Sequence, residues 1–89
     1  MNRVFLSGTI NSDVKVYYSP RGEKICIFSL LVDDGMFSVE VVCKYNRTTN
    51  LPEFKKTDRI MLSGALARTK KGSPEALRLE ADKLFVMEV

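Results

Sequence analysis

Two long apolar segments flank the tripeptide Asp33–Asp34–Gly35, and this arrangement constrains the fold more than any other feature of the chain. The segments are KICIFSLLV (24–32) and MFSVEVVCKY (36–45). Glycine adopts positive φ angles without steric cost and aspartate tolerates them. The tripeptide therefore predicts a tight hairpin turn with Asp34–Gly35 at its centre, joining two long antiparallel strands.

A two-residue turn at Asp34–Gly35 determines which residues lie opposite one another, because paired residue numbers must then sum to 69. The predicted pairs are Phe37 with Val32, Val39 with Leu30, Val41 with Phe28, and Cys43 with Cys26. They form one apolar row, which predicts the core face of the hairpin. We expect the two cysteines to be cross-strand neighbours that act as small buried apolar side chains in a reducing compartment.

The opposite face of the hairpin carries three aliphatic residues on its first strand, Ile25, Ile27 and Leu31. On the outside of a small barrel these side chains would meet water, and exposed apolar rows mark interaction surfaces. We therefore predict that Ile25, Ile27 and Leu31 form a subunit interface. A chain of 89 residues has a small core, which oligomerisation would support.

Further segments predict strands because they are rich in β-branched and apolar residues. They are residues 3–10, 14–18 (a second short strand or a continuation of the first), 58–68 and 75–89. The composition of the last segment also favours a helix, but its apolar and charged residues alternate over 77–82, which indicates a strand. Residues 46–57 read as an irregular connector with one possible helical turn at 52–56.

This strand plan predicts an all-β chain that forms a five-stranded OB-fold Greek-key barrel, as a single domain over residues 1–89. A long connector between the third and fourth strands of that barrel supports the prediction. A sandwich usually needs more strands. An SH3-like barrel is the structural alternative, although its strands are typically shorter than those of the 24–45 hairpin.

The composition argues against catalysis. The chain has no histidine, which removes the commonest general base and the common nucleophile systems. Its two cysteines do not form a Cys-x-x-Cys motif, and no phosphate-binding glycine motif occurs. We therefore expect a protein that is not an enzyme and has no metal and no cofactor. With no apolar run of ~18 residues and no secretory signal, it is expected to be cytoplasmic.

Positive charge is concentrated in the middle of the chain. The formal net charge is +3, but residues 44–71 carry eight Lys or Arg against two Asp or Glu. The stretch RTKKGSP (68–74) holds Arg68, Lys70 and Lys71 and no acid, although a turn needs only its Gly and Pro. Such a cluster fits a polyanionic partner, and it also fits a solvated face with counter-charges nearby in space.

Several stretches resemble the bacterial single-stranded-DNA-binding protein family, and most closely its short branch, the primosomal replication protein N group. They are NRVFLSGTI (2–10), SPRGEKICIFSL (19–30), MLSGALARTKKG (61–72) and LRLEADKL (77–84). The resemblance implies an OB-fold, binding of single-stranded DNA without sequence preference, a cytoplasmic homodimer or homotetramer, and no catalysis. It also implies contacts with a replication-restart helicase and its loader. The chain ends without the Gly/Pro-rich linker and acidic tip of the larger family members, which favours the primosomal branch or a truncated homologue.

The family binds through a basic groove and stacking aromatic residues. The resemblance places Arg68, Lys70 and Lys71 on its gripping loop and matches Phe37 to a stacking aromatic, whereas the hairpin pairing turns Phe37 toward the core. The family's Trp a few positions further on is replaced by Ser38 or Val42, and the chain has no Trp. The remaining candidate platforms are Tyr17, Tyr18 and Tyr45, each of which would also fit as a half-buried strand tyrosine.

The sequence thus predicts a nucleic-acid-binding surface formed by Lys15, Tyr17, Phe37, Lys44, Tyr45, Arg47, Arg68, Lys70 and Lys71. Aromatic side chains stack on any base, and Lys or Arg side chains meet phosphates, so this surface would bind single strands without reading their sequence. An RNA-binding OB module is a variant of this prediction. A protein-interaction adaptor, whose basic loop meets an acidic protein surface, is the alternative of a different class.

Overall fold

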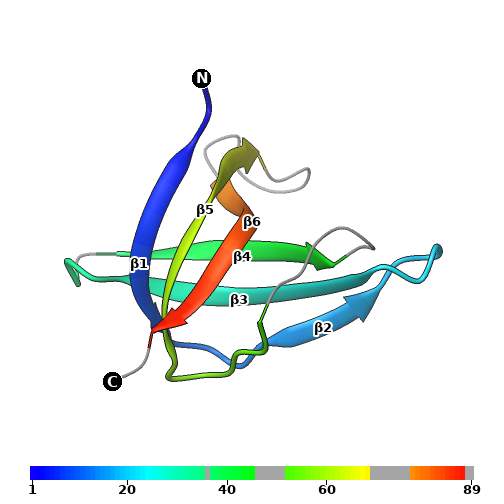
Figure 1. The fold of residues 1–89 in the computed structure, drawn as a ribbon, viewed down its shortest axis with the longest axis horizontal. Coiled ribbons are helices and arrows are strands. Elements are labelled where there is room, and N and C mark those ends of the chain that lie inside the picture. Colours follow the sequence, from blue (N-terminus) through cyan, green and yellow to red (C-terminus); the bar gives the residue numbers. More distant parts are fainter. Residues whose placement is uncertain (36, 46–51, 69–76, 88–89) are drawn as a thin grey trace.

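The computed structural model describes residues 1–35, 37–45, 52–68 and 77–87, which form six β-strands (Figure 1). The strands are β1 (Val4–Ile10), β2 (Lys15–Tyr18), β3 (Lys24–Val32), β4 (Ser38–Tyr45), β5 (Arg59–Arg68) and β6 (Leu77–Met87). Every predicted strand is confirmed over its described residues; residues 36, 75–76 and 88–89 of the predicted ranges lie outside them. Within the described part of the chain, no helix is long and apolar enough to cross a membrane.

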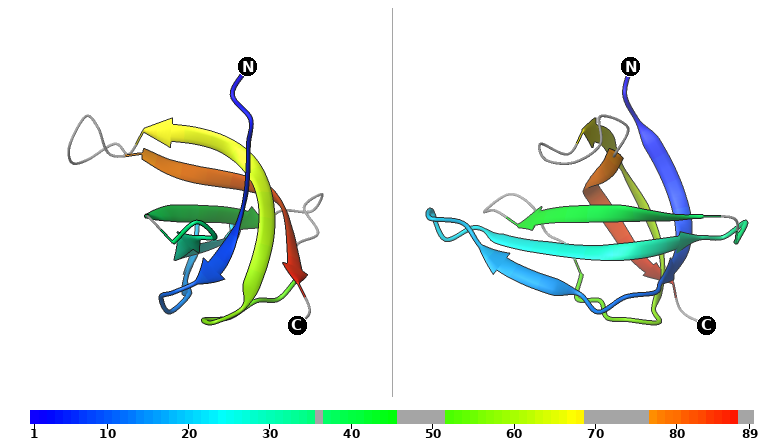
Figure 2. Two further views of the ribbon diagram at one scale, coloured as in Figure 1. Left: turned by 90° about the vertical axis from the view of Figure 1, so that its left-hand side faces the viewer. Right: turned by 180° about the vertical axis from the view of Figure 1, so that it is seen from behind.

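Five of the strands close into a barrel, which confirms the predicted OB-fold. Hydrogen bonding links them in the order β1-β5-β6-β4-β3, and β1 also pairs with β3 to complete the ring. The β4–β6 pair is parallel and the other pairs are antiparallel. Figure 2 shows that β1, β5 and β6 cross the layer of β2, β3 and β4 at a steep angle. The remaining strand, β2, extends this second layer by pairing with β3.

The β3–β4 hairpin has the predicted register but a longer turn. Cys26 pairs with Cys43, as Phe28 does with Val41 and Leu30 with Val39, so the paired numbers sum to 69. The tight turn is centred on Asp33 and Asp34, because the Gly35 amide donates to the Val32 carbonyl at 2.7 Å. Gly35 follows with a φ of 73°, which glycine adopts without strain. A four-residue connection leaves the same residues opposite one another as the predicted two-residue turn.

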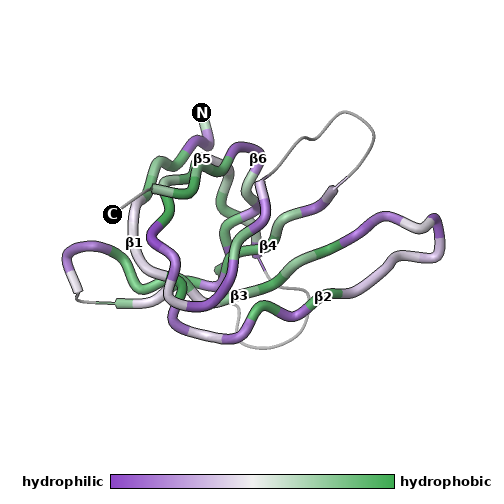
Figure 3. Tube along the Cα trace, turned by 60° about the horizontal axis from the view of Figure 1, so that its bottom comes forward, coloured by the Kyte–Doolittle hydropathy of each residue, from purple (hydrophilic) through white to green (hydrophobic). Residues whose placement is uncertain are grey.

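The core fills the ring of strands seen along the barrel in Figure 3. Its buried members are Ile10, Cys26, Phe28, Leu30, Val41, Cys43, Ile60, Leu62, Leu79 and Leu84. The apolar row predicted from the hairpin is therefore the core face, with one exception. Phe37 is 52% exposed, because it precedes β4 at the end of the hairpin, beyond the strands that cover the core. The prediction that Phe37 faces the core is wrong.

Two glycines let strands approach closely where the barrel closes. Gly8 pairs with Val32 of β3 and with Ile60 of β5, and a Cβ there would lie 2.2 Å from the Leu31 carbonyl oxygen. At Gly64 a Cβ would lie 2.1 Å from the Glu80 carbonyl oxygen. Distances this short exclude any side chain while the backbones stay in place, so both positions require glycine.

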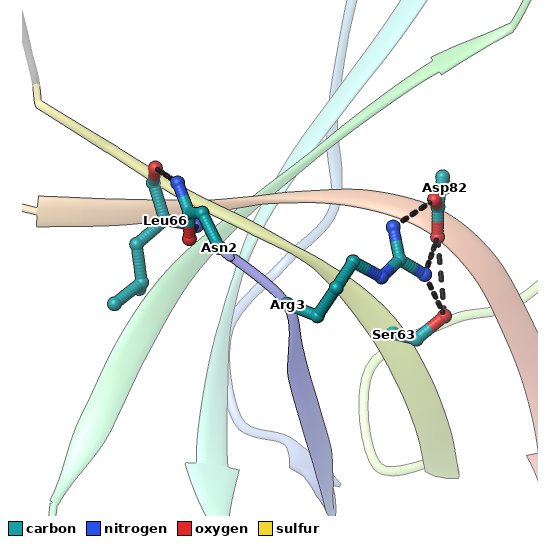
Figure 4. Close-up of polar contacts among 5 residues, drawn as sticks. All are labelled: Asn2, Arg3, Ser63, Leu66 and Asp82. Carbon is teal, nitrogen blue, oxygen red and sulfur yellow. Dashed lines mark hydrogen bonds and ion pairs between the residues drawn. The ribbon is translucent and has the colours of Figure 1, made fainter.

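A β-bulge in β6 organises the N-terminus. Ser63 pairs with Lys83 and Gly64 with Ala81, which leaves Asp82 as the extra residue. The Asp82 carboxylate accepts hydrogen bonds from the Arg3 guanidinium at 2.6 Å and from the Ser63 hydroxyl at 3.1 Å (Figure 4). The Arg3 hydrogen bond lowers the pKa of the Asp82 carboxyl.

The Asn2 side chain lengthens the β1–β5 ladder by one more pair. Its amide nitrogen donates to the Leu66 carbonyl at 2.8 Å, and its amide oxygen accepts from the Leu66 backbone amide at 3.0 Å (Figure 4). The Asn-Arg start of the chain thus has a structural role, because Asn2 and Arg3 hold β1 against β5 and β6.

The connector before β5 covers one end of the barrel. Phe54 packs edge-on against Phe28 with the ring centroids 5.1 Å apart. The predicted helical turn at 52–56 is not present, because the described residues from Pro52 onward form a turn at Lys56 and Thr57 instead. The Thr57 amide donates to the Ile10 carbonyl at 2.8 Å, which holds Thr57 at a φ of 79°.

Candidate nucleic-acid interface

The outer face of β2, β3 and β4 brings together three of the predicted binding residues. Directly paired residues of neighbouring strands lie on the same side of a sheet. Lys15 pairs with Ile27, and Ile25 lies between Tyr17 on β2 and Lys44 on β4. Lys15, Tyr17 and Lys44 are exposed, so two cations and one aromatic ring face solvent over an aliphatic base.

Tyr17 and Lys44, but not Lys15, border a shallow depression of about 440 Å³. Its lining is Tyr17, Ile25, Ile27, Val42, Lys44 and Arg78. Val42 is only 3% exposed although it points away from the core, because neighbouring strands on both sides cover it. The depression therefore combines an apolar floor with an aromatic wall and two positive charges.

This geometry corrects one premise of the predicted subunit interface. Ile25 and Ile27 are half-buried rather than exposed, since they form the floor under Tyr17 and Lys44. Leu31, at 36% exposure, is the exposed member of the predicted trio. Ile25 and Ile27 therefore belong both to the predicted subunit interface and to the predicted binding surface. The sequence analysis treats these as two different surfaces.

Phe37 offers a second exposed aromatic ring at the opposite end of the hairpin. Tyr17 pairs with Ile25, and the Val32 amide donates to the Phe37 carbonyl at 3.1 Å. The two rings are thus separated by about seven residues of β3, or roughly 23 Å at the rise of a β-strand. A ligand that meets both rings must extend along most of β3 and pass the end of the hairpin, because Phe37 lies opposite Val32, which faces the core.

Tyr45 is not part of this surface. It packs against the core, and the Lys24 ammonium lies 5.1 Å from its ring centroid. Burial is the main cause of the raised pKa of its phenol, and the adjacent Cys26 adds to it. The Tyr45 ring is half-buried, and its stacking role stays a prediction.

Of the predicted loop cations Arg68, Lys70 and Lys71, only Arg68 lies among the described residues. Arg68 ends β5 and is exposed, and it pairs with Leu77. The neighbouring pair, Ala67 with Arg78, lies on the other side of the sheet because side chains alternate along a strand. Arg47, Lys70 and Lys71 lie outside the described residues.

Arg78 is a candidate contact that the sequence reasoning missed. It lies on β6 opposite Glu40 of β4, and its guanidinium is 3.2 Å from the Glu80 carboxylate. The sequence shows only that Arg78 alternates with Leu77 and Leu79 and therefore faces outward. Its place beside Tyr17 and Lys44 follows from the parallel β4–β6 pairing, which has no local signal in the sequence.

A second exposed apolar surface lies on the opposite side of the barrel and was also missed. Phe5, Met61 and Phe85 are 74%, 49% and 63% exposed. Met61 pairs with both Ser7 and Phe85, so the three side chains share the outer face of β1, β5 and β6. The Arg3 guanidinium lies 6.0 Å from the Phe5 ring centroid. We call these three residues the Phe5–Met61–Phe85 surface.

The reactive side chains offer no recognisable catalytic arrangement among the described residues. Cys26 and Cys43 are both buried thiols without a disulfide, as predicted, and burial raises the pKa of Cys43 to about 12. Among residues 1–35, 37–45, 52–68 and 77–87, no group of three Cys, Asp or Glu side chains is placed to hold a metal ion.

Solved structures share this fold. No protein-family model matches the chain, and no curated protein is significantly similar to it in sequence. The N-terminal domain of the PriB protein from Thermoanaerobacter tencongensis, described as dimeric, matches with a TM-score of 0.77 at 20% identity, over 99% of this chain and 98% of that chain. The PriB protein from Ralstonia solanacearum matches with a TM-score of 0.70 at 21% identity, over 99% of both chains.

The single-stranded DNA binding protein from Thermus aquaticus also matches. Its TM-score is 0.71 at 20% identity, over 99% of this chain and 50% of that chain. This chain therefore corresponds to about half of the Thermus protein and to nearly the whole of the two PriB chains. At these identities the similarity establishes the OB fold that the sequence predicted.

Proposed function

We propose that this protein binds single-stranded DNA without sequence specificity, as a non-catalytic component of replication or replication restart. The observation that carries the proposal is the outer face of β2–β4, where the exposed ring of Tyr17 lies beside Lys15 and Lys44. The fold similarity to PriB and to a single-stranded DNA binding protein supports it. Replication-restart proteins are the proposed protein partners.

The chemistry of this face suits a flexible strand better than a duplex. Every base has a π face, so a ring such as that of Tyr17 can stack on any unpaired base, for roughly 1–3 kcal/mol each. In a duplex the bases are already stacked and do not reach the ring. A single strand on this face could stack a base on Tyr17 while Lys15 and Lys44 meet its phosphates. To use Phe37 as well it would have to pass around the end of the hairpin, because Phe37 lies opposite the core-facing Val32.

The cations of the β5–β6 connection are proposed as further phosphate contacts. Arg68 is exposed at the start of this connection, and Lys70 and Lys71 follow within it. Replacing all three with alanine should weaken binding and leave the fold intact. Each lost contact should make the slope of log affinity against log salt shallower by about 0.7, or ~2 for the triple variant.

Fluorescence anisotropy with dT, rU and duplex DNA probes across about 50–200 mM salt tests the proposal. We expect the dT oligomer to bind more tightly than the duplex at every salt concentration. Equal or tighter duplex binding would contradict the single-strand proposal. Tighter rU binding would indicate an RNA-binding module, and no binding to any probe would favour the adaptor alternative.

We also propose that the protein is a homodimer in which a second copy covers the Phe5–Met61–Phe85 surface. Its side chains are more exposed than Ile25, Ile27 and Leu31, and covering it leaves the Tyr17–Lys44 face open to a ligand. The interface predicted from the sequence, through Ile25, Ile27 and Leu31, would instead close the Tyr17–Lys44 face to a ligand. It would cover the apolar floor that Tyr17 and Lys44 surround.

Matched charge substitutions separate the two interfaces. Sedimentation velocity should show the wild type at about twice the monomer mass of 10.1 kDa, and Phe85→Glu should shift it to monomer. Ile27→Glu should leave the dimer intact, provided that circular dichroism shows both variants to be folded. Dissociation by Ile27→Glu alone would establish the β3 interface, and a monomeric wild type at tens of micromolar would contradict both.

A further inference from the structure

Arg78 lies in an unusual environment for an arginine on the outside of a barrel. Its side chain is 29% exposed, and the described residues offer its buried Nε no hydrogen-bond partner. Buried polar nitrogens are nearly always paired, and an unpaired one destabilises the fold. The contact with Glu80, at 3.2 Å, engages one terminal nitrogen of the guanidinium. Glu80 therefore holds the Arg78 side chain in place, and the guanidinium still has N–H groups that can donate hydrogen bonds to a ligand.

The surroundings of Arg78 match the needs of an unpaired nucleotide. Arg78 and Tyr17 lie on strands separated by three sheet spacings, or about 14 Å, with the depression between them. Its floor is formed by Ile25, Ile27 and Val42. Because Val42 is only 3% exposed, the half-buried Ile25 and Ile27 offer most of the apolar surface to a ring system. Bases in protein complexes stack on tyrosine rings and on arginine guanidinium planes, and a lysine beside them meets the phosphate.

We propose that Tyr17, Lys44 and Arg78 form a nucleotide subsite that holds one unpaired base over the apolar floor of Ile25, Ile27 and Val42, with Lys44 on the adjacent phosphate. The proposal rests on the proposed function, because it names the place on this protein where a single strand is gripped. Glu80 acts as a positioning residue, since its carboxylate holds the Arg78 guanidinium at the edge of the depression.

The proposed subsite requires the planar guanidinium of Arg78 and not only its positive charge. A lysine at position 78 would keep the positive charge but lose the planar group on which a base can stack. If Arg78 acted only through its charge, Arg78→Lys would bind like the wild type. Lys83 provides the matched control, because it is an exposed cation on the same strand but pairs with Ser63 on the other side of the barrel.

The test measures affinity for a dT oligomer of about 12 nucleotides, within the ~4–16 nucleotides that one OB fold covers. Anisotropy titrations compare the wild type with Tyr17→Ala, Tyr17→Phe, Arg78→Lys, Arg78→Ala and Lys83→Ala. We expect Tyr17→Ala to weaken binding by about 5- to 150-fold, whereas Tyr17→Phe should retain it. Arg78→Lys should lose more affinity than Lys83→Ala, and the Tyr17→Ala Arg78→Ala double variant should lose less than the product of the single losses.

A second readout follows the tyrosines directly, since the chain contains three tyrosines and no tryptophan. Stacking on Tyr17 should quench the tyrosine emission on addition of dT, and Tyr17→Phe should remove most of that change. A wild type that binds dT, with Tyr17→Ala and Arg78→Ala both indistinguishable from Lys83→Ala, would overturn the subsite and leave the proposed function intact. Failure of the wild type to bind dT at any salt concentration would overturn both.

Discussion

Substitution of Gly64 by alanine should destabilise the protein strongly, although the same exchange at an uncrowded glycine is mild. A Cβ at position 64 would lie 2.1 Å from the Glu80 carbonyl oxygen and 2.8 Å from the Ala81 Cα. Ordinary contacts begin near 3.4 Å, so β5 and β6 would have to separate by more than an ångström at the bulge. Both obstructing groups are backbone, which cannot rotate away as a flexible side chain would.

The loss of unfolding free energy can be estimated from the interactions that break when β5 and β6 separate. Overpacking of this kind costs about 1–3 kcal/mol, and the loss of two ladder hydrogen bonds beside Gly64 adds about 1 kcal/mol each. The sum is about 3–5 kcal/mol, out of a total stability of about 4–13 kcal/mol for a chain of this length. At ~4–8 °C per kcal/mol, even the lower value lowers the Tm by about 12–24 °C.

Thermal and urea unfolding followed by far-UV circular dichroism, at one protein concentration, would measure the change. Gly22→Ala is the matched control, because no atom lies within 4 Å of a Cβ there. Gly22→Ala should lower the stability only by the strain of placing alanine at a φ of +84°, about 1–2 kcal/mol. A Gly64→Ala variant that melts within about 4 °C of the wild type, or above Gly22→Ala, would refute the close approach of β5 and β6.

Other substitutions test the core, the connector and the ion pairs. Leu30→Ala should cost about 2–5 kcal/mol in urea unfolding, because Leu30 is 0% exposed and the cavity cannot fill; a loss below about 1 kcal/mol would contradict this burial. Thr57→Gly should stabilise the fold by about 1 kcal/mol, since glycine relieves the left-handed backbone of a β-branched residue at φ 79°, and an unchanged or lower urea midpoint would argue against the strain. Arg3 lowers the pKa of Asp82 in the folded protein, so the ionised Asp82 carboxylate stabilises the fold. This stabilisation is complete above the pKa of aspartate in the unfolded chain, near 3.9, and is lost as the pH falls through the lower pKa of the folded state. Asp82→Asn should therefore melt lower at pH 7 and show a smaller further fall in Tm between about pH 4 and pH 2 than the wild type; parallel curves would show that the pair is not formed.

The strand plan and the hairpin register could be predicted because both depend on local patterns. Two long apolar segments flank Asp33–Asp34–Gly35, and one turn between them then sets every opposing pair, including Cys26 with Cys43. The turn itself is longer than predicted, yet the pairs are unchanged because the connection lengthens symmetrically on both sides. The absence of histidine likewise limits the available chemistry, because composition does not depend on how the chain folds.

Exposure could not be predicted in the same way, because it depends on segments that are distant in sequence. The alternation that buries Val41 would also turn Phe37 inward, but Phe37 lies past the end of the covering strands and is exposed. Conversely, Ile25 and Ile27 alternate outward and are still half-buried. Their cover comes from β2 and β4 side chains and from Arg78 on β6.

The sequence by itself thus determined the strand content, the long hairpin, the OB barrel and the concentration of positive charge. Tertiary structure alone decided which residues share a surface. Tyr17 and Arg78 are separated by most of the sequence, and they border the same depression because β4 pairs in parallel with β6 while β2 extends β3. Periodicity records which way a side chain points from its own strand, but the identity of its neighbours is set by the order in which the strands close the barrel.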